Sequence, residues 1–276
     1  MTTTSLMTEA PDVPTAPTSE TPAKPFPLVR HSLVLAGRSI VKIRRTPEQL
    51  LDVTLQPIIF TVLFVYLFGG AIAGSQQAYL QFVLPAILVQ SILFATLAIG
   101  VNLNTDMSKG VFDRFRSLPI PRSAPLVGAV LGDLVRFVTT IVVLFAFGYA
   151  IGFRVETNLF QALAACLLVL FFAFSLTWIA VFIGTAVRNS GTVQGIGFLL
   201  MFPLTFGSNM FVPIDTMPGW LQAWVKINPV THLTDACRGL LTGGAVATPV
   251  LQSIVAATVI MAVFAPLAVR TYRART

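Results

Sequence analysis

Long apolar runs separated by short polar links dominate the chain from residue 50 onward. A helix that crosses a hydrocarbon layer about 30 Å thick needs roughly 20 apolar residues at 1.5 Å per residue, and six runs reach that length. The predicted spans are residues 50–69, 79–103, 123–152, 159–187, 192–212 and 249–269. The pattern predicts an all-α integral membrane protein whose single membrane domain covers residues 28–276.

The N-terminal segment differs from the rest of the chain. Residues 1–27 contain six prolines and scarcely a large apolar side chain before Phe26, which predicts a disordered cytoplasmic tail. Residues 28–45 then place apolar side chains on one helical face and Arg38, Lys42 and Arg45 on another. This pattern favours a helix lying in the membrane interface, with a solvated basic segment as the alternative.

A charged and aromatic stretch, TDMSKGVFDRFRSLPIPR, lies between the second and third spans at residues 105–122. Val111, Phe115 and Leu118 recur at helical spacing and form one narrow apolar stripe. Prolines at the end of the stretch stop the helix after about three turns. We expect a short amphipathic helix at the membrane surface, which serves either as a connector or as a contact for a soluble partner.

The link between the fifth and sixth spans, residues 213–248, is too polar to span and too apolar for an ordinary loop. Trp220 and Trp224 share one helical face, as expected of side chains at the headgroup level. Asn228 and the following proline form an N-cap and first-turn pair for a second short helix, which ends near Gly243. The pattern predicts two re-entrant helices in the outer leaflet that pack on the bundle or line a path.

Composition and charge support this topology. The chain is 55% hydrophobic and 11% charged, with a mean hydropathy of +0.82, whereas soluble domains have roughly 25% charged residues. Placing both termini, the 105–122 stretch and the turn after the fourth span in the cytoplasm puts 15 of the 18 Lys and Arg inside. The positive-inside rule therefore predicts a multi-pass protein of the cell membrane with cytoplasmic termini, and the net charge of +7 needs no nucleic-acid partner.

Several kinds of chemistry have no support in the sequence. Cys166 and Cys237 form no disulfide framework or metal signature, and His31 and His232 have no carboxylate or cysteine cluster near them. The chain contains no Gly-x-x-x-x-Gly-Lys-Ser/Thr loop, so it does not bind a nucleotide in that manner. We predict no catalytic, cofactor or metal site. Four glycine pairs have the small-xxx-small spacing, for which internal packing is favoured over a dimer seam: 128/132, 148/152, 191/195 and 239/243.

Charged residues near the lipid occur as two pairs with i, i+3 spacing. Asp133 with Arg136, and Asp235 with Arg238, form either part of a substrate or ion route or two self-neutralising pairs at the interfaces, which is the favoured interpretation. An ion-coupled carrier is expected to keep acidic or His side chains near mid-bilayer, and none is clearly placed there. The uncharged polar residues Gln90, Ser208 and Asn209 are the hypothesised lining of a path for an amphipathic solute.

Three strings carry a resemblance to a known family: KGVFDRFRSLPIPR at 109–122, SNMFVPIDTMPGWLQ at 208–222 and NPVTHLTDACRG at 228–239. With the predicted order of elements, the chain from residue 28 to the end resembles the ABC type-2 permeases, especially the daunorubicin-resistance permease group. The resemblance implies the permease subunit of an ATP-driven exporter of hydrophobic or amphipathic compounds, without its own ATPase site. The alternatives are an ion-coupled carrier and a non-transporting membrane assembly or anchor protein.

The resemblance also implies partners. Two copies of a separate ABC ATPase would bind ATP and Mg, and a second permease chain, identical or different, would complete a dimer. The helix after the second span would be the coupling helix that contacts the ATPase, formed by Lys109, Gly110, Phe112, Asp113, Arg114, Phe115 and Arg116. Many family members have a glutamate where Met107 or Lys109 stands here, and Asp106 and Asp113 are the nearest acidic substitutes.

Overall fold

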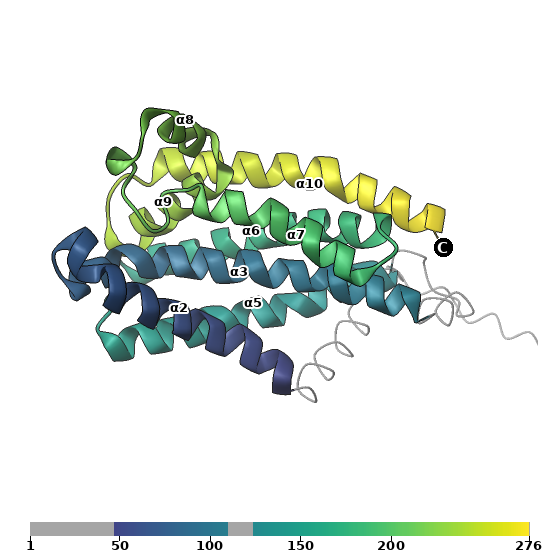
Figure 1. Ribbon diagram of the computed structural model, residues 1–276, viewed down its shortest axis with the longest axis horizontal. Coiled ribbons are helices and arrows are strands. Elements are labelled where there is room, and N and C mark those ends of the chain that lie inside the picture. Colours follow the sequence, from purple (N-terminus) through teal and green to yellow (C-terminus); the bar gives the residue numbers. More distant parts are fainter. Residues whose placement is uncertain (1–46, 110–123, 276) are drawn as a thin grey trace, which may run out of the picture.

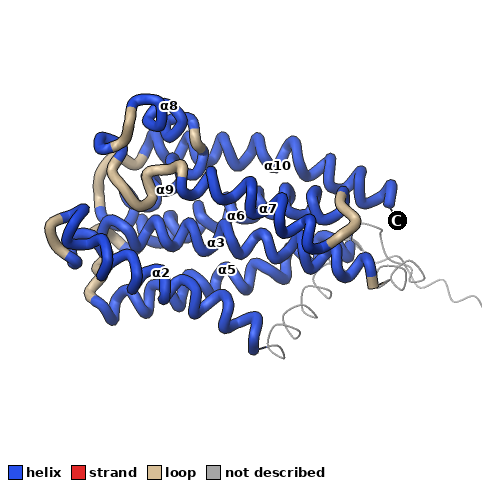
Figure 2. Tube along the Cα trace, viewed as in Figure 1, coloured by secondary structure: helices blue, strands red, loops and turns tan. Residues whose placement is uncertain are grey.

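The computed structural model describes residues 47–109 and 124–275, and all regular elements in these two ranges are helices (Figures 1 and 2). Three predictions lie outside the described residues: the tail at 1–27, the interfacial helix with Arg38, Lys42 and Arg45, and most of the coupling helix. The long helices lie roughly side by side as a bundle, with the short helices α8 (Gly219–Ile227) and α9 (Pro229–Thr242) gathered at one end (Figure 1).

Within residues 47–109 and 124–275, five helices are long and apolar enough to cross a membrane. Their bounds are α2 Pro47–Ala73, α3 Gln76–Ser108, α5 Ala124–Ile151, α6 Leu159–Ala186 and α10 Ala247–Arg275. The fifth predicted span corresponds to α7, Ser190–Phe206, an apolar helix of 17 residues. The chain is therefore a multi-pass, all-helical membrane protein over its described residues, and the count of six crossings stays a prediction.

Helix α3 is the centre of the bundle (Figure 1). It contacts α2, α5, α6, α7 and α9, and 78% of its most apolar stretch is buried inside the chain, against 11% for α10. A uniformly apolar helix buries every face when other helices surround it. Helix α10 packs one side on α6 and α9, and most of its remaining apolar surface faces away from the described part of this chain, where lipid or another protein can cover it.

Small residues let α3 and α6 cross closely. A Cβ atom on Gly184 of α6 would lie 2.5 Å from the carbonyl oxygen of Gly100 of α3, and one on Gly100 would clash with the backbone of Ala180. Where glycine provides no side chain at a crossing, the backbones of two membrane helices approach closely and make tight van der Waals contacts. This crossing was missed in the sequence, although Ala180 and Gly184 have the small-xxx-small spacing.

The predicted internal packing is present for the 148/152 pair and for Gly239 but not for Gly243, and no contact among the described residues supports it for the 191/195 pair. Gly148 packs against Leu84, and Gly239 packs against the carbonyl of Ala245. Gly191 and Gly195 meet no other helix among the described residues, because their side of α7 faces outward. The side-chain surroundings of residues 128 and 132 lie outside the described part of the chain.

Helix α7 ends at Phe206, six residues before the end of the predicted span. Its C-terminal carbonyls find partners outside the helix: the side-chain amide of Asn228 donates to Leu204 and Gly207 at 2.8 and 2.9 Å. The other side of the same amide accepts from the backbone N–H of Val230 and caps α9. Asn228 thus satisfies carbonyls at the end of one helix and an N–H at the start of another, which stabilises the early end of α7.

Two short helices follow, α8 Gly219–Ile227 and α9 Pro229–Thr242, after the single 3-10 turn η1 Ile214–Thr216. Asn228 caps α9 with Pro229 in its first turn, and Gly243, at a positive φ of 90°, ends it. The predicted pair of short helices between the fifth and sixth predicted spans is therefore present. The depth of this pair in a membrane stays a prediction.

Candidate functional site

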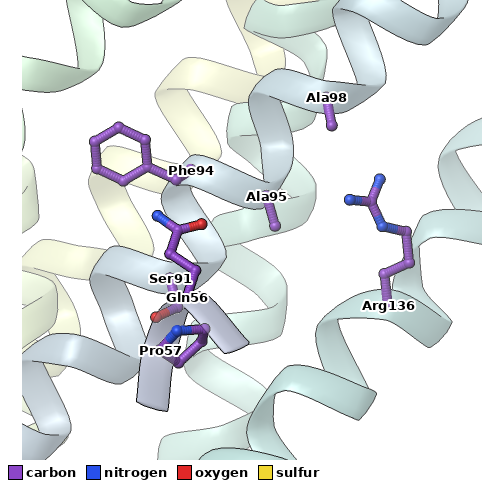
Figure 3. A pocket seen from close by; sticks show the side chains of 7 residues that line it. All are labelled: Gln56, Pro57, Ser91, Phe94, Ala95, Ala98 and Arg136. Atoms are coloured by element: carbon purple, nitrogen blue, oxygen red, sulfur yellow. The ribbon is translucent and has the colours of Figure 1, made fainter. Parts of the chain in front are cut away.

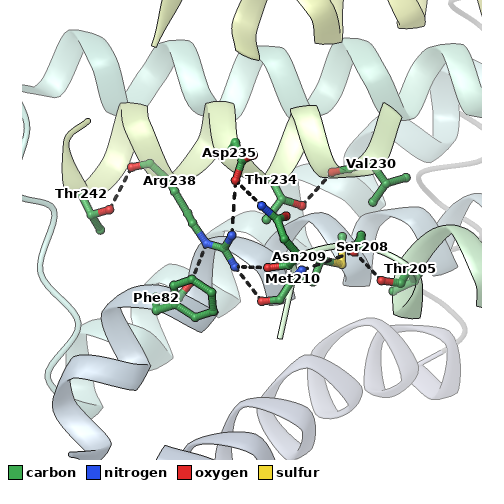
Figure 4. A network of polar contacts seen from close by, with 10 residues as sticks. All are labelled: Phe82, Thr205, Ser208, Asn209, Met210, Val230, Thr234, Asp235, Arg238 and Thr242. Atoms are coloured by element: carbon green, nitrogen blue, oxygen red, sulfur yellow. Dashed lines mark hydrogen bonds and ion pairs between the residues drawn. The ribbon is translucent and has the colours of Figure 1, made fainter. Parts of the chain in front are cut away.

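Arg238 of α9 is the centre of a polar network at the end of the bundle where α8 and α9 lie (Figure 4). Its Nε donates to the backbone oxygen of Phe82 on α3 at 3.0 Å. Its Nη2 donates to the backbone oxygens of Asn209 and Met210 at 2.9 and 2.7 Å. The guanidinium also lies over the Phe82 ring, 3.7 Å from its centroid, as a cation–π contact.

The accepting carbonyls belong to a non-helical segment. Residues 208–212 follow the end of α7 and belong to no helix, so their backbone oxygens need other partners. Arg238 satisfies those of Asn209 and Met210, and the hydroxyl of Tyr79 donates to that of Phe211 at 2.9 Å. Side chains from α3 and α9 therefore hold this segment in place against the bundle.

Arg238 keeps its charge in this environment. Burial lowers the pKa of Arg238 from its usual range to about 10, and the neighbouring carboxylate of Asp235 opposes that decrease. The pKa stays well above neutral pH, so the guanidinium is charged at pH 7. The predicted ion pair is present, with Nη1 of Arg238 lying 3.5 Å from Oδ1 of Asp235.

Asn209 completes the network. Its side-chain Nδ2 donates to Asp235 at 2.6 Å, so the carboxylate is shared between Asn209 and Arg238 (Figure 4). Its Oδ1 has no hydrogen-bond partner, and the same is true of the buried hydroxyls of Thr205 on α7 and Thr231 on α9. Buried polar atoms without partners are unusual in a folded chain and need an explanation. These unpartnered polar atoms can form hydrogen bonds with a polar solute or with water.

The three residues hypothesised to line a path are all buried, at 2%, 2% and 8% exposure for Gln90, Ser208 and Asn209. Asn209 belongs to the Arg238 network, whereas Ser208 donates back to the carbonyl of Thr205 within its own turn. Gln90 lies on α3 and shares no hydrogen bond with either, because both of its amide atoms are without partners. The structure therefore does not join the three into one polar surface.

The two tryptophans of α8 lie outside the network. Trp220 is 76% exposed and Trp224 is 41% exposed, so both present aromatic surface outward. The indole nitrogen of Trp224 lies against Gly207, where a Cβ atom would come within 2.7 Å of it. Exposed tryptophan at this end of the bundle is typical of side chains at a membrane interface.

At the opposite end, α3 leads into the predicted coupling helix. Lys109 caps α3 and is exposed, and the remaining predicted coupling residues lie outside the described part of the chain. Asn104, five residues earlier, donates from Nδ2 to the backbone oxygens of Gly184 and Val187 at 2.9 and 2.6 Å. This contact fastens the end of α3 to the end of α6, immediately before the predicted coupling helix.

The second predicted ion pair is also present. Nη1 of Arg136 lies 3.3 Å from Oδ1 of Asp133 on α5. Groups of three or more His, Cys, Asp or Glu side chains that could hold a metal ion do not occur among the described residues. The described site is therefore built from hydrogen-bonding and cationic side chains rather than from metal ligands.

Several network residues were not identified from the sequence. The sequence did not indicate a role for Tyr79 and Phe82 in a polar network, because aromatic residues are common at the start of an apolar run. Asn104 closes an apolar run, and a buried asparagine there was a usable signal. Asn228 was identified as a helix cap, but its contact with α7 depends on the tertiary fold.

Together, the fold and the network define a polytopic membrane protein whose helices enclose partly unsatisfied polar groups. Residues 31–242 match the family model described as "ABC-2 type transporter". The chain is 40% identical over 245 residues to the daunorubicin resistance ABC transporter permease protein DrrB1 of Streptomyces coeruleorubidus, covering 89% of this chain and 87% of the relative. The chain therefore belongs to the ABC-2 type transporter family.

Other relatives agree with this placement. A probable doxorubicin resistance ABC transporter permease protein, DrrC of Mycobacterium tuberculosis, is 27% identical over 262 residues, which is 94% of both chains. The doxorubicin resistance permease DrrB of the same species is 30% identical over 192 residues, 67% of this chain and 66% of the relative. These matches agree with the resemblance inferred from the three sequence strings.

Proposed function

We propose that this chain is the permease subunit of an ATP-driven exporter that moves hydrophobic or amphipathic drugs out of the cell. The observation that carries the proposal is the 40% identity, across most of both chains, to a permease named for daunorubicin resistance. The bundle of membrane-length apolar helices supports it, since such a chain suits a passage through lipid. A lipid-like solute is the alternative cargo.

Energy enters from a separate chain in this proposal. Two copies of an ABC ATPase bind ATP and Mg, and a second permease chain, identical or different, completes the dimer. The ATPase contacts the coupling helix through Lys109, Gly110, Phe112, Asp113, Arg114, Phe115 and Arg116. The hydrogen bonds from Asn104 on α3 to the end of α6 support a coupling role, because a displacement of this end of α3 would also move α6.

The topology in this proposal has both termini and the coupling helix in the cytoplasm and the α8–α9 pair at the outer face. The distribution of Lys and Arg supports this orientation. The basic residues Arg38, Lys42 and Arg45 contact the headgroups of the inner leaflet, and Trp220 and Trp224 lie at the outer headgroup level.

Gln90, Ser208 and Asn209 are the proposed polar contacts for the solute. Each is buried in this conformation, so a solute reaches them only when α3, α7 and α9 move apart. The unpartnered amide of Gln90 supports the proposal, because leaving a buried polar group without a partner costs about 1–3 kcal/mol and a hydrogen-bonding solute would remove that cost. Asn209 offers its free Oδ1 in the same way.

Affinity purification of the tagged chain from its native membrane, in a mild detergent, tests the partner. The proposal expects a second protein in equal amount that contains a phosphate-binding loop and binds ATP. A purified permease with no such chain, together with drug transport that needs no ATP, would instead establish an ion-coupled carrier. A parallel purification with a Phe115→Glu variant controls for specificity, since loss of the partner from that variant alone locates the contact.

A further inference from the structure

A small cavity lies between α2, α3 and α5, away from the Arg238 network (Figure 3). Its volume is about 30 Å³, and it is lined by Gln56, Pro57, Ser91, Phe94, Ala95, Ala98 and Arg136. One water molecule needs roughly 10–15 Å³ of this kind of space. The cavity therefore has room for one or two oxygen atoms, and it is far too small for a whole drug molecule.

Arg136 gives the cavity its charge. Its guanidinium points from α5 toward the side of α3 that carries Ala95 and Ala98 (Figure 3). The residue is 4% exposed, and the one polar contact of its guanidinium among the described residues is the 3.3 Å pair with Asp133 through Nη1. Its Nε has no hydrogen-bond partner. A buried guanidinium has five N–H donors, so most of this donor capacity is unused.

The partly buried Arg238, whose side chain is 12% exposed, shows how a guanidinium with more hydrogen-bond partners is arranged in this chain. Arg238 donates to three backbone oxygens in addition to its carboxylate. Arg136 has no such carbonyl partners, because the neighbouring stretches of α3 and α5 are regular helix whose carbonyls are already bonded. A ligand that fills the donors of Arg136 must bring its own acceptor oxygens.

The rest of the lining restricts the class of ligand. Ser91 and Gln56 are further groups that can donate hydrogen bonds, and the remaining lining residues are apolar. A cationic group would face the guanidinium and is disfavoured. An oxyanion has acceptors only and forms charge-assisted hydrogen bonds with a guanidinium, which are about twice as strong as neutral ones.

The depth of the cavity decides where the oxyanion comes from. The end of the bundle assigned to the outer face is marked by the 2.6 Å hydrogen bond from Gln77 to the carbonyl of Gly152. Arg136 lies sixteen residues from Gly152 along α5, which is about 24 Å at 1.5 Å per residue. Ala98 lies twenty-one residues from Gln77 along α3, which is about 32 Å.

Helix α2 gives a similar depth. Gly69 packs against Gln76 at the same end, and Gln56 lies thirteen residues away, about 20 Å along the helix. Against a hydrocarbon core about 30 Å thick, all three helices place the cavity in the opposite half of the bilayer, on the way to the opposite boundary. In the proposed topology that boundary is the inner leaflet, where lipid phosphates lie.

We propose that this cavity binds the phosphate oxygens of an anionic lipid of the inner leaflet, with Arg136 as the main donor and Ser91 and Gln56 as supporting donors. The acyl chains lie outside the cavity, past the partly exposed side chains of Phe94 and Ala98. Free inorganic phosphate has the same acceptor oxygens, but it has no acyl chains to contact these apolar side chains. This lipid site depends on the proposed orientation of the chain in the membrane but not on drug transport. Its test can therefore fail while the proposed function holds, or succeed while the proposed function fails.

Native mass spectrometry of the full-length chain tests the proposal. The chain is purified in a mild detergent and titrated with dioleoyl phosphatidylglycerol or with dioleoyl phosphatidylcholine, which have the same acyl chains. We expect one tightly retained phosphatidylglycerol per chain, and Arg136→Gln to weaken that binding about tenfold or more, as loss of charge-assisted hydrogen bonds requires. Arg273→Gln, which removes an exposed arginine at the same end of the bundle, should leave it within about twofold.

A second variant separates lost binding from lost folding. Ala98→Leu fills the cavity while leaving the Asp133–Arg136 pair in place, and it should also lose the retained lipid. Thermal unfolding and elution as a single species verify that each variant is folded. Equal retention by wild type, Arg136→Gln and Ala98→Leu would overturn the proposal. Displacement of the phosphatidylglycerol by millimolar inorganic phosphate would assign the site to free phosphate and would overturn the lipid assignment.

Discussion

The Nη2 atom of Arg238 lies 2.7 Å from the backbone oxygen of Met210, and this contact fastens α9 to the non-helical segment that follows α7. The segment needs such a partner, because an exposed backbone carbonyl without a hydrogen bond is costly away from water. Arg238 therefore acts as a substitute for the missing turns of helix at this end of the bundle. Its hydrogen bonds join α9 to α3 and to the segment that follows α7.

Arg238→Gln should destabilise this end of the bundle. The variant removes buried charge-assisted hydrogen bonds, each of which contributes about 1.5–3 kcal/mol, and it leaves the oxygens of Asn209 and Met210 short of partners. We expect a loss of about 3 kcal/mol or more in the free energy of unfolding. Arg238→Lys should recover only part of it, because an ammonium cannot reach all the acceptors.

Thermal unfolding in detergent, with limited proteolysis of the 207–218 segment, measures this effect. Lys226→Gln on α8 is the matched control, because Lys226 is exposed and at the same end of the bundle. If Arg238→Gln unfolds and resists proteolysis like the wild type, Arg238 does not hold the segment in place.

Gln90→Leu should raise stability while it lowers export. The substitution replaces a buried amide whose nitrogen and oxygen both lack partners, so about 1–3 kcal/mol of unsatisfied polar burial is removed. Gln90→Met, which keeps the length of the side chain, should behave in the same way. Opposite changes in unfolding temperature and drug export would identify Gln90 as a functional polar group. Export that is unchanged in both variants would remove Gln90 from the proposed path.

Gly184→Ala should loosen the crossing of α3 and α6. The new Cβ atom would lie 2.5 Å from the carbonyl oxygen of Gly100, and neither helix can move without breaking its packing. We expect a loss of about 1–3 kcal/mol in the free energy of unfolding, as overpacking typically causes. Gly195→Ala on α7 is the matched control, because a Cβ atom there meets nothing within 4 Å.

The control should be neutral or should stabilise the helix slightly, since alanine is a better helix former than glycine by about 1 kcal/mol. Thermal unfolding of both variants in the same detergent is the measurement. Equal unfolding temperatures for Gly184→Ala and wild type would show that the crossing is not tightly packed in the membrane.

Phe115→Glu and Arg116→Glu should abolish drug-stimulated ATP hydrolysis while the chain still inserts in the membrane. Both residues belong to the predicted coupling helix, where a reversed charge or a charge in the apolar stripe would disrupt a contact with the ATPase. Arg273→Glu is the control, because it makes the same charge reversal on an exposed residue at the same end of the bundle. Normal stimulation in Phe115→Glu and Arg116→Glu would remove this helix from the coupling contact.

Much of the fold follows from hydropathy and from helix-capping residues. Apolar runs of membrane length predicted the long helices, and Asn228 with Pro229 predicted the start of α9, because these signals are local. The end of α7 was predicted six residues late because Met210, Phe211 and Val212 resume the apolar run after Gly207, Ser208 and Asn209 interrupt it. The amide of Asn228, on a different element, binds carbonyls left at that end, and no local pattern records that contact.

The candidate site was less predictable than the fold. The i, i+3 spacing correctly predicted the pairs of Asp133 with Arg136 and of Asp235 with Arg238, because such pairs need one helix only. The backbone acceptors of Arg238 and the unpartnered Nε of Arg136 depend on how helices far apart in the sequence pack. For the same reason, the sequence alone did not show that Gln90 and Asn209 are buried or that they share no hydrogen bond, and their role in a solute path stays a prediction.

The most direct test of the central claim is the energy source of drug movement. In inside-out vesicles that contain the permease and its ATPase, uptake of a fluorescent drug such as daunorubicin should need ATP and should be insensitive to a proton uncoupler. Omitting the ATPase should abolish the uptake. Uptake by this chain alone, without ATP and collapsed by the uncoupler, would contradict the account and would establish an ion-coupled carrier.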